Sequence, residues 1–174
     1  SATFKYLFSD LGRIGNSRGA SSVAFDLGVL YKCEINDWEG AGWSVGLHVS
    51  NLGPKINYLT SKDALPATVK VGGAADLPFL QMHKLTLTAD LGYRLSPADV
   101  QALSVSAGAE YAWRELVMLR GGYHCGDKKK GDASYATAGA GVEYAGVRLD
   151  FAWLFAGHEY LARNTFWVSL GYSF

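Results

Sequence analysis

Apolar and polar residues alternate with a period of two along almost the whole chain, and this alternation divides it into ten segments. Each segment is roughly 9–13 residues long, close to the length of a tilted strand that crosses a bilayer. Successive side chains of a strand point to opposite faces, so every segment has one apolar and one polar face. The segments are 2–10, 21–33, 41–51, 67–77, 83–95, 101–114, 115–127, 133–145, 147–157 and 164–174. The pattern predicts an all-β chain.

The apolar face of these segments is rich in Leu, Val and aromatic residues, and the aromatic residues gather near segment ends. In the second segment this face carries Val23, Phe25, Leu27, Val29 and Tyr31. In the last segment it carries Phe166, Val168, Leu170, Tyr172 and Phe174. Apolar faces bordered by aromatic rings are typical of the lipid-facing surface of an outer-membrane barrel. The alternative is a soluble β-sandwich, whose two apolar faces pack against each other.

Composition limits the class of protein further. The chain has 174 residues, with 16 Lys+Arg and 16 Asp+Glu, so the sequence gives no support for a nucleic-acid partner. Mean hydropathy is +0.04, and no run of about 18 apolar residues is present that spans a bilayer as a helix. A barrel has such an average because its polar and apolar positions cancel. We predict one antiparallel transmembrane β-barrel domain over residues 1–174, with about ten strands, in the outer membrane of a Gram-negative bacterium.

The lengths of the connections agree with a barrel. If the C-terminal end is periplasmic, the periplasmic turns are 33–41, 78–83, 113–116 and 145–147. The external loops are then 10–20, 51–66, 95–100, 127–132 and 157–164. Short periplasmic turns and longer external loops are usual in such barrels. This topology places Cys33 and Cys125 at opposite rims, which excludes a disulfide because the two Cα atoms must lie within about 7 Å.

The polar face carries acidic and basic side chains in nearly equal numbers. The predicted lumen charge network comprises Lys70, Asp90, Arg94, Glu110, Arg120, Glu143, Arg148 and Asp150. The same face is predicted to carry Lys5, Asp26, His48, Asp76, Arg114 and His124. Balanced signs favour cross-strand ion pairs that fill a narrow interior over a ring of one sign that selects ions. A solute path through the interior is the alternative.

The sequence predicts neither a catalytic residue nor a bound cofactor. His48 and His124 fall on different strands with no third ligand near either in sequence, so no metal site is predicted. The chain has no HExxH motif, so we expect it not to be an enzyme. Gly139 and Gly141 fall within one strand, where we expect them to permit bends or close side-chain packing across the barrel.

The best candidate for a functional segment lies where the third strand ends. Pro54 has no N–H to donate to a strand ladder, so Gly53-Pro54 should break or bulge the strand there. The residues proposed as a partner or substrate gate are Asn51, Gly53, Pro54, Lys55 and Ile56. A plain strand end followed by an external loop is the alternative.

Several stretches resemble the PorV family, FadL-like outer-membrane proteins of the type IX secretion system in Bacteroidota. They are FKYLFSDLG and SSVAFDLGVLYK, then SVGLHVSNLGPKINYLT at Ser44–Thr60, LPATVKVGGAADL at Leu65–Leu77, and the hairpins from Ser106 to Phe155. The most specific parts are SNLGPKI and the GAEY, LRGGY and GAG sequences, in that order. The resemblance covers most of the chain.

The resemblance implies a role in protein transport. Members of that family bind cargo that carries a type IX signal domain, associate with a large translocon barrel (Sov/SprA-like), and pass cargo to a surface attachment complex. The family is about twice as long as this chain and resembles a fourteen-stranded barrel. We therefore expect residues 1–174 to be the C-terminal ten strands of a longer barrel, with a closed ten-stranded barrel as the alternative.

Two other functions remain open at this point. FadL-like relatives include outer-membrane channels for hydrophobic small molecules, and a small structural barrel without a transport role has the same alternation. Bound lipid in a continuous lumen favours the channel, whereas capture of translocon or cargo favours secretion. Outer-membrane lipid is an expected partner in every case.

Overall fold

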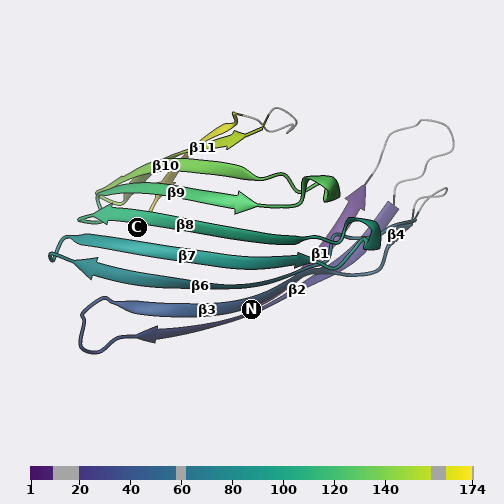
Figure 1. The fold of residues 1–174 in the computed structure, drawn as a ribbon, viewed down its shortest axis with the longest axis horizontal. Helices are drawn as coiled ribbons and strands as arrows, with labels where there is room; N and C mark the ends of the chain where they lie inside the picture. Colours follow the sequence, from purple (N-terminus) through teal and green to yellow (C-terminus); the bar gives the residue numbers. More distant parts are fainter. Residues whose placement is uncertain (10–19, 58–61, 158–163, 174) are drawn as a thin grey trace.

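A computed structural model describes residues 1–9, 20–57, 62–157 and 164–173 of the chain. Ten strands form one antiparallel sheet in the order β1-β2-β3-β6-β7-β8-β9-β10-β11-β12 (Figure 1). Their bounds are Ala2–Ser9 (β1), Ala20–Glu34 (β2), Gly42–Leu52 (β3), Thr68–Phe79 (β6), His83–Arg94 (β7), Leu103–Trp113 (β8), Val117–Cys125 (β9), Tyr135–Tyr144 (β10), Val147–Ala156 (β11) and Phe166–Tyr172 (β12). The predicted all-β antiparallel fold is confirmed.

Four short elements lie between these strands and were not predicted. Ile56–Asn57 (β4) and Lys62–Asp63 (β5) pair with each other within the connection from β3 to β6. The 3-10 turns Ala98–Val100 (η1) and Lys128–Lys130 (η2) belong to two further connections. Each was too short to produce a periodic signal in the sequence.

The register of the sheet keeps the predicted polar residues on one face. Residues that face each other across neighbouring antiparallel strands share a face, and Arg120 faces Glu110 on β8 and Gly139 on β10. Glu143 faces Arg148 in the same way. Arg114 is the exception, because it lies in the turn after β8 with a φ of 52° and its guanidinium lies over the Trp113 ring. Its prediction as a lumen residue was wrong.

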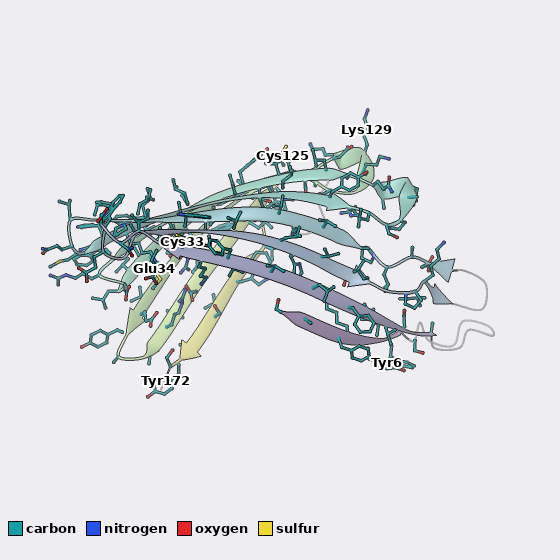
Figure 2. The ribbon with its side chains drawn as sticks, turned by 90° about the horizontal axis from the view of Figure 1, so that it is seen from below. Tyr6, Cys33, Glu34, Cys125, Lys129 and Tyr172 are labelled. Carbon is teal, nitrogen blue, oxygen red and sulfur yellow. The ribbon has the colours of Figure 1, made fainter. Side chains whose placement is uncertain are left out.

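The sheet is rolled into a trough and does not close. Figure 2 shows the first and last strands bent to the same side of the central strands, and Cys125, from the apolar face, on the convex side. The polar face therefore lines the concave side. Within the described residues, β1 and β12 form no ladder with each other, so the alternative of a closed ten-stranded barrel does not hold here.

No large apolar core lies under this sheet. The buried hydrophobic side chains are mostly small, and no large side chain in the described part of the chain is fully buried. By contrast, Leu170 on β12 is 76% exposed and Val29 on β2 is 72% exposed, and both belong to the convex face. A sandwich buries such residues against a second sheet, and the described residues provide only the small β4–β5 pair beside the main sheet.

The two rims of the sheet differ as expected. The turn rim is made of connections 35–41, 80–82, 114–116 and 145–146, which are short turns except for the first. The loop rim, made of the connections after β1, β3, β7, β9 and β11, has longer ones. Cys33 lies one residue before the end of β2 at the turn rim and Cys125 ends β9 at the loop rim, and both thiols are free. Phe174 and parts of the loops after β1, β3 and β11 lie outside the described residues.

Candidate functional site

A chain of alternating charges crosses four strands on the concave face. Arg120 on β9 bonds Glu110 on β8 through Nε and Asp150 on β11 through Nη1, the latter at 2.6 Å. Arg148 donates from Nε to the other oxygen of Asp150 at 2.7 Å, and its Nη1 lies 3.7 Å from Glu143. The structure thus joins five of the eight predicted network residues.

A glycine makes this arrangement possible. Arg120 must reach over β10 to contact Asp150 on β11, and Gly141 is the residue that faces Asp150 on β10. A Cβ atom at position 141 would lie 2.5 Å from Asp150 Oδ1 and 3.2 Å from Arg120 Nη1. Any larger residue there would push the two charged groups apart, so the predicted close-packing role applies to Gly141.

The other three predicted network residues lie outside this cluster. Within the described residues, Lys70 and Asp90 form no ion pair within 4.0 Å, and Arg94 instead donates to the carbonyl oxygen of Lys130 at 3.1 Å. Lys70 and Asp90 border a hollow of about 710 Å³ on the concave side of β2, β3, β6 and β7, which Gly46 and Gly72 help to floor. The charge chain therefore occupies the concave face of β8 to β11, whereas the hollow lies on the concave side of β2, β3, β6 and β7.

The two histidines predicted to face the lumen have different surroundings. His124 contacts Ser106 Oγ through Nδ1 and Asp132 Oδ1 through Nε2, each at 3.0 Å, and its ring stacks on Tyr135. His48 is exposed beside the hollow. Asp132 escaped the sequence analysis because it lies in the loop after β9, where alternation carries no information about direction.

The predicted gate segment begins at a bulge in the sheet. The register between β2 and β3 shifts between Phe25 and Leu27, and Asn51 there has a φ of 57°. Its N–H donates to Asp26 Oδ1 at 2.8 Å, and Lys5 from β1 lies 2.5 Å from Asp26 Oδ2. Lys5 also donates to Asn51 Oδ1 at 3.2 Å. The Lys5–Asp26–Asn51 cluster thus ties three strands together, and the sequence did not reveal it.

Beyond this cluster the chain turns over the concave face of β2. Ser22 donates to the carbonyl oxygen of Pro54 at 3.0 Å. A Cβ atom at Gly53 would overlap the carbonyl oxygen of Val23 and lie 2.9 Å from Leu65 Cδ1. The inward residues of the loop-rim half of β2 are accordingly buried, and Ala24 is fully covered. The segment is therefore more than a strand end, because it lies across the inside of the sheet.

The remaining gate residues lie further out in this connection. Lys55 is exposed, and Ile56 is half-buried in β4. The structure therefore brings Asn51, Gly53 and Pro54 against β2 and leaves Lys55 accessible at the loop rim.

Aromatic side chains form two rows on the convex face, one near each rim. Near the turn rim they are Tyr31, Trp43, Phe79, Trp113, Tyr144 and Tyr172. Near the loop rim they are Tyr6, Phe8, Tyr93, Tyr123, Phe155 and Phe166. Smaller apolar residues such as Leu87 and Leu91 lie between the rows and are also exposed. Two aromatic rows that border an apolar band are the pattern of a surface that crosses a membrane.

Two other features of the described residues bear on function. No helix among them is long and apolar enough to cross a membrane. In the described part of the chain, no group of three or more His, Cys, Asp or Glu side chains is placed to hold a metal ion.

The fold and the surface define the class first: a rolled, barrel-like antiparallel sheet with a polar concave face and an apolar convex face. The family model described as type IX secretion system protein PorV matches residues 1–101 of the 174. The chain therefore belongs to the PorV family, and the prediction from sequence resemblance is confirmed. The match includes Asn51–Ile56 and ends before the charge chain. A comparison with curated proteins gives no match.

Proposed function

We propose that this chain is a noncatalytic outer-membrane component of type IX secretion, which binds signal-domain cargo at the translocon barrel and carries it to the surface attachment complex. The family match supports the secretion role and carries the proposal. The apolar convex face with its two aromatic rows supports the location, because such a surface is stable in a bilayer and not in water. We propose the usual orientation of outer-membrane barrels, in which the rim with short turns is periplasmic and the rim with long loops is external.

We further propose that residues 1–174 form a single domain within a larger barrel. Among the described residues, the outer edges of β1 and β12 have no neighbouring strand. Unpaired N–H and C=O groups at such edges are costly in lipid unless further strands pair with them. In the membrane-embedded full-length protein, amide hydrogen exchange at both edges should be slow. Fast exchange at Phe4 and Val168 in that protein would contradict the proposal.

The most accessible part of the gate segment is the first place to test for cargo contact. Lys55→Glu reverses an exposed charge at the loop rim, and Lys32→Glu does the same at the turn rim. A tagged full-length protein should recover a Sov/SprA-like barrel and signal-domain cargo from membranes. We expect Lys55→Glu to lower cargo recovery while Lys32→Glu leaves it unchanged. If the unaltered protein recovers neither partner, the proposed function is wrong.

A FadL-type channel for hydrophobic small molecules is the second candidate. The observation in its favour is the hollow of about 710 Å³ on the concave face, a size within the range of small-molecule sites. Extraction of the purified protein followed by lipid analysis tests this function. An apolar ligand present in stoichiometric amount would favour the channel over the secretion role, provided that it is absent from the Gly46→Leu variant, whose new side chain fills the hollow.

A further inference from the structure

The connection from β9 to β10 presents three consecutive lysines, Lys128–Lys130, in the 3-10 turn η2. The turn has a fixed shape, because Asp127 Oδ1 accepts the N–H of Lys129 at 2.9 Å and Gly131 closes the turn with a φ of 75°. Lys130 anchors it to the neighbouring loop, with its Nζ donating to the carbonyl oxygen of Asp99 at 3.2 Å.

The side chains of Lys128 and Lys129 take no part in these contacts. Both are exposed, and neither forms an ion pair within 4.0 Å with any described residue. In the loop itself, Asp127 caps η2 and Asp132 contacts His124, whereas Asp99 of the neighbouring loop forms no ion pair within 4.0 Å with a described residue. Two adjacent ammonium groups are thus available to an external anion.

Their position suggests what that anion is. Figure 2 shows Lys129 on the convex side of the sheet, the same side as Cys125 at the end of β9. Tyr123, two residues before Cys125, belongs to the aromatic row at the loop rim and is 56% exposed. Aromatic rows mark the interface between lipid tails and water, and lysines just beyond them extend to the level of the lipid headgroups.

We propose that Lys128 and Lys129 bind phosphomonoester headgroups of lipids in the leaflet next to the loop rim. This inference rests on the proposed outer-membrane location. Among the described residues, the turn rim has no two adjacent unpaired lysines on the convex side: Lys84 lies 3.3 Å from Asp76, the Arg114 guanidinium stacks over Trp113, and Lys32 lies on the concave face. The two rims therefore differ in their affinity for anionic lipid, which gives the barrel an electrostatic preference for one orientation.

The test measures lipid binding by the folded full-length protein in zwitterionic detergent, with phosphatidic acid and phosphatidylcholine as probes. Each lysine near an anionic membrane surface contributes about 1 kcal/mol, so losing two weakens binding about 30-fold. We expect Lys128→Gln/Lys129→Gln to weaken phosphatidic acid binding by about this factor and to leave phosphatidylcholine binding unchanged. Lys130 is retained because it anchors the turn.

Two controls make the result specific. Lys32→Gln/Arg114→Gln removes the same charge from exposed side chains at the turn rim and should change binding by less than about twofold, since screening limits charge effects to about 10 Å. Lys128→Arg/Lys129→Arg should restore the affinity. An equal loss of phosphatidic acid affinity in the two glutamine variants, or no loss in either, would overturn the inference. It would also be overturned if inorganic phosphate displaced phosphatidic acid at equal concentration.

A separate experiment distinguishes a wrong lysine site from a wrong membrane location. Flotation of the unaltered protein with neutral phosphatidylcholine liposomes tests whether it inserts into a bilayer at all. A protein that does not float refutes the membrane location. A protein that floats, while its Lys128→Gln/Lys129→Gln variant keeps full affinity for phosphatidic acid, refutes only the lysine site.

Discussion

Arg120 is the side chain on which most of the concave charge chain depends. Among the described residues, it is the one side chain that bonds the Glu110 carboxylate, and it shares Asp150 with Arg148. In Arg120→Ala, Glu110 keeps its charge and loses this partner, and hydrogen bonds to charged groups contribute about 1.5–3 kcal/mol. We expect the free energy of unfolding to fall by this amount. The change would be seen as a lower midpoint temperature for conversion of the folded band to the unfolded band on unboiled gels.

Arg114→Ala is the matched control for this variant. It removes the same side chain from an exposed turn, where the guanidinium contacts Met82 and the Trp113 ring. Exposed charges contribute about 0–1 kcal/mol, so its midpoint should stay close to that of the unaltered protein. An Arg120→Ala midpoint equal to that of Arg114→Ala would show that the charge chain does not stabilise the sheet.

Glu143 belongs to the same chain but should matter much less. Among the described residues, its side chain forms an ion pair only with Arg148, at 3.7 Å, and both side chains are more than a third exposed, at 39% and 43%. Such pairs contribute about 0–1 kcal/mol. We expect Glu143→Ala to shift the unfolding midpoint by less than half the Arg120→Ala shift in the same assay. A larger shift would mean that the pair is shielded from water in the membrane.

At the residue scale, alternation predicts the face of a side chain but not its partner. Every strand residue of the predicted network lies on the expected face, because the period of a strand fixes direction. Arg114 failed because it lies one residue beyond the strand, where that period ends. The pairing of Arg120 with Asp150 across β10 could not be predicted, because it depends on registers that no single segment contains.

The β3–β6 connection is the element whose position should respond most to a single substitution. Asp26 is 8% exposed and bonds both the Asn51 N–H and the Lys5 ammonium. In Asp26→Ala both groups lose this partner, so the start of the connection should separate from β2 more often. Because a hydrogen bond to a charged group contributes about 1.5–3 kcal/mol, we expect the Asn51 amide to exchange hydrogen about tenfold to hundredfold faster.

Asp76→Ala provides the comparison at the other rim. Asp76 accepts a hydrogen bond from Thr86 at 2.6 Å and pairs with Lys84. Its loss removes a similar set of contacts without touching the β3–β6 connection. The Asn51 amide should therefore exchange at its original rate in Asp76→Ala. Slow exchange of that amide in Asp26→Ala as well would show that the connection is held by other contacts.

At the element scale, the strands were predictable and the long connection was not. The predicted segments 83–95 and 147–157 match β7 and β11 to within one residue at each end, because the apolar pattern stops where a strand leaves the apolar environment. Gly53-Pro54 correctly indicated a break after β3. It gave no direction for the chain beyond, since that direction follows from contacts with Ser22, Asp26 and Leu65.

At the scale of the whole molecule, the two faces of the sheet provide for two different environments. The apolar convex face is suited to the proposed contact with lipid, while the concave face keeps its charges in pairs or beside a hollow. The sequence predicted these two faces and ten strands. Alternation alone did not decide whether the ten strands close on themselves, because closure depends on strand tilt and stagger summed over the whole sheet. The expectation that they are part of a longer barrel came from the family resemblance.

Trp153 and Trp167 allow this division of faces to be measured. They lie on neighbouring rungs of the β11–β12 pair, where Trp153 faces Phe166 and Ala152 faces Trp167, so the two indoles share a level and point to opposite faces. Two variants of the full-length protein would be reconstituted into vesicles, one with Trp153 as its only tryptophan and one with Trp167. Brominated acyl chains should quench Trp153 strongly and Trp167 weakly, because only the convex face contacts lipid, and aqueous acrylamide should do the reverse. Equal quenching of both by the brominated lipid would contradict a barrel wall with one lipid-facing side.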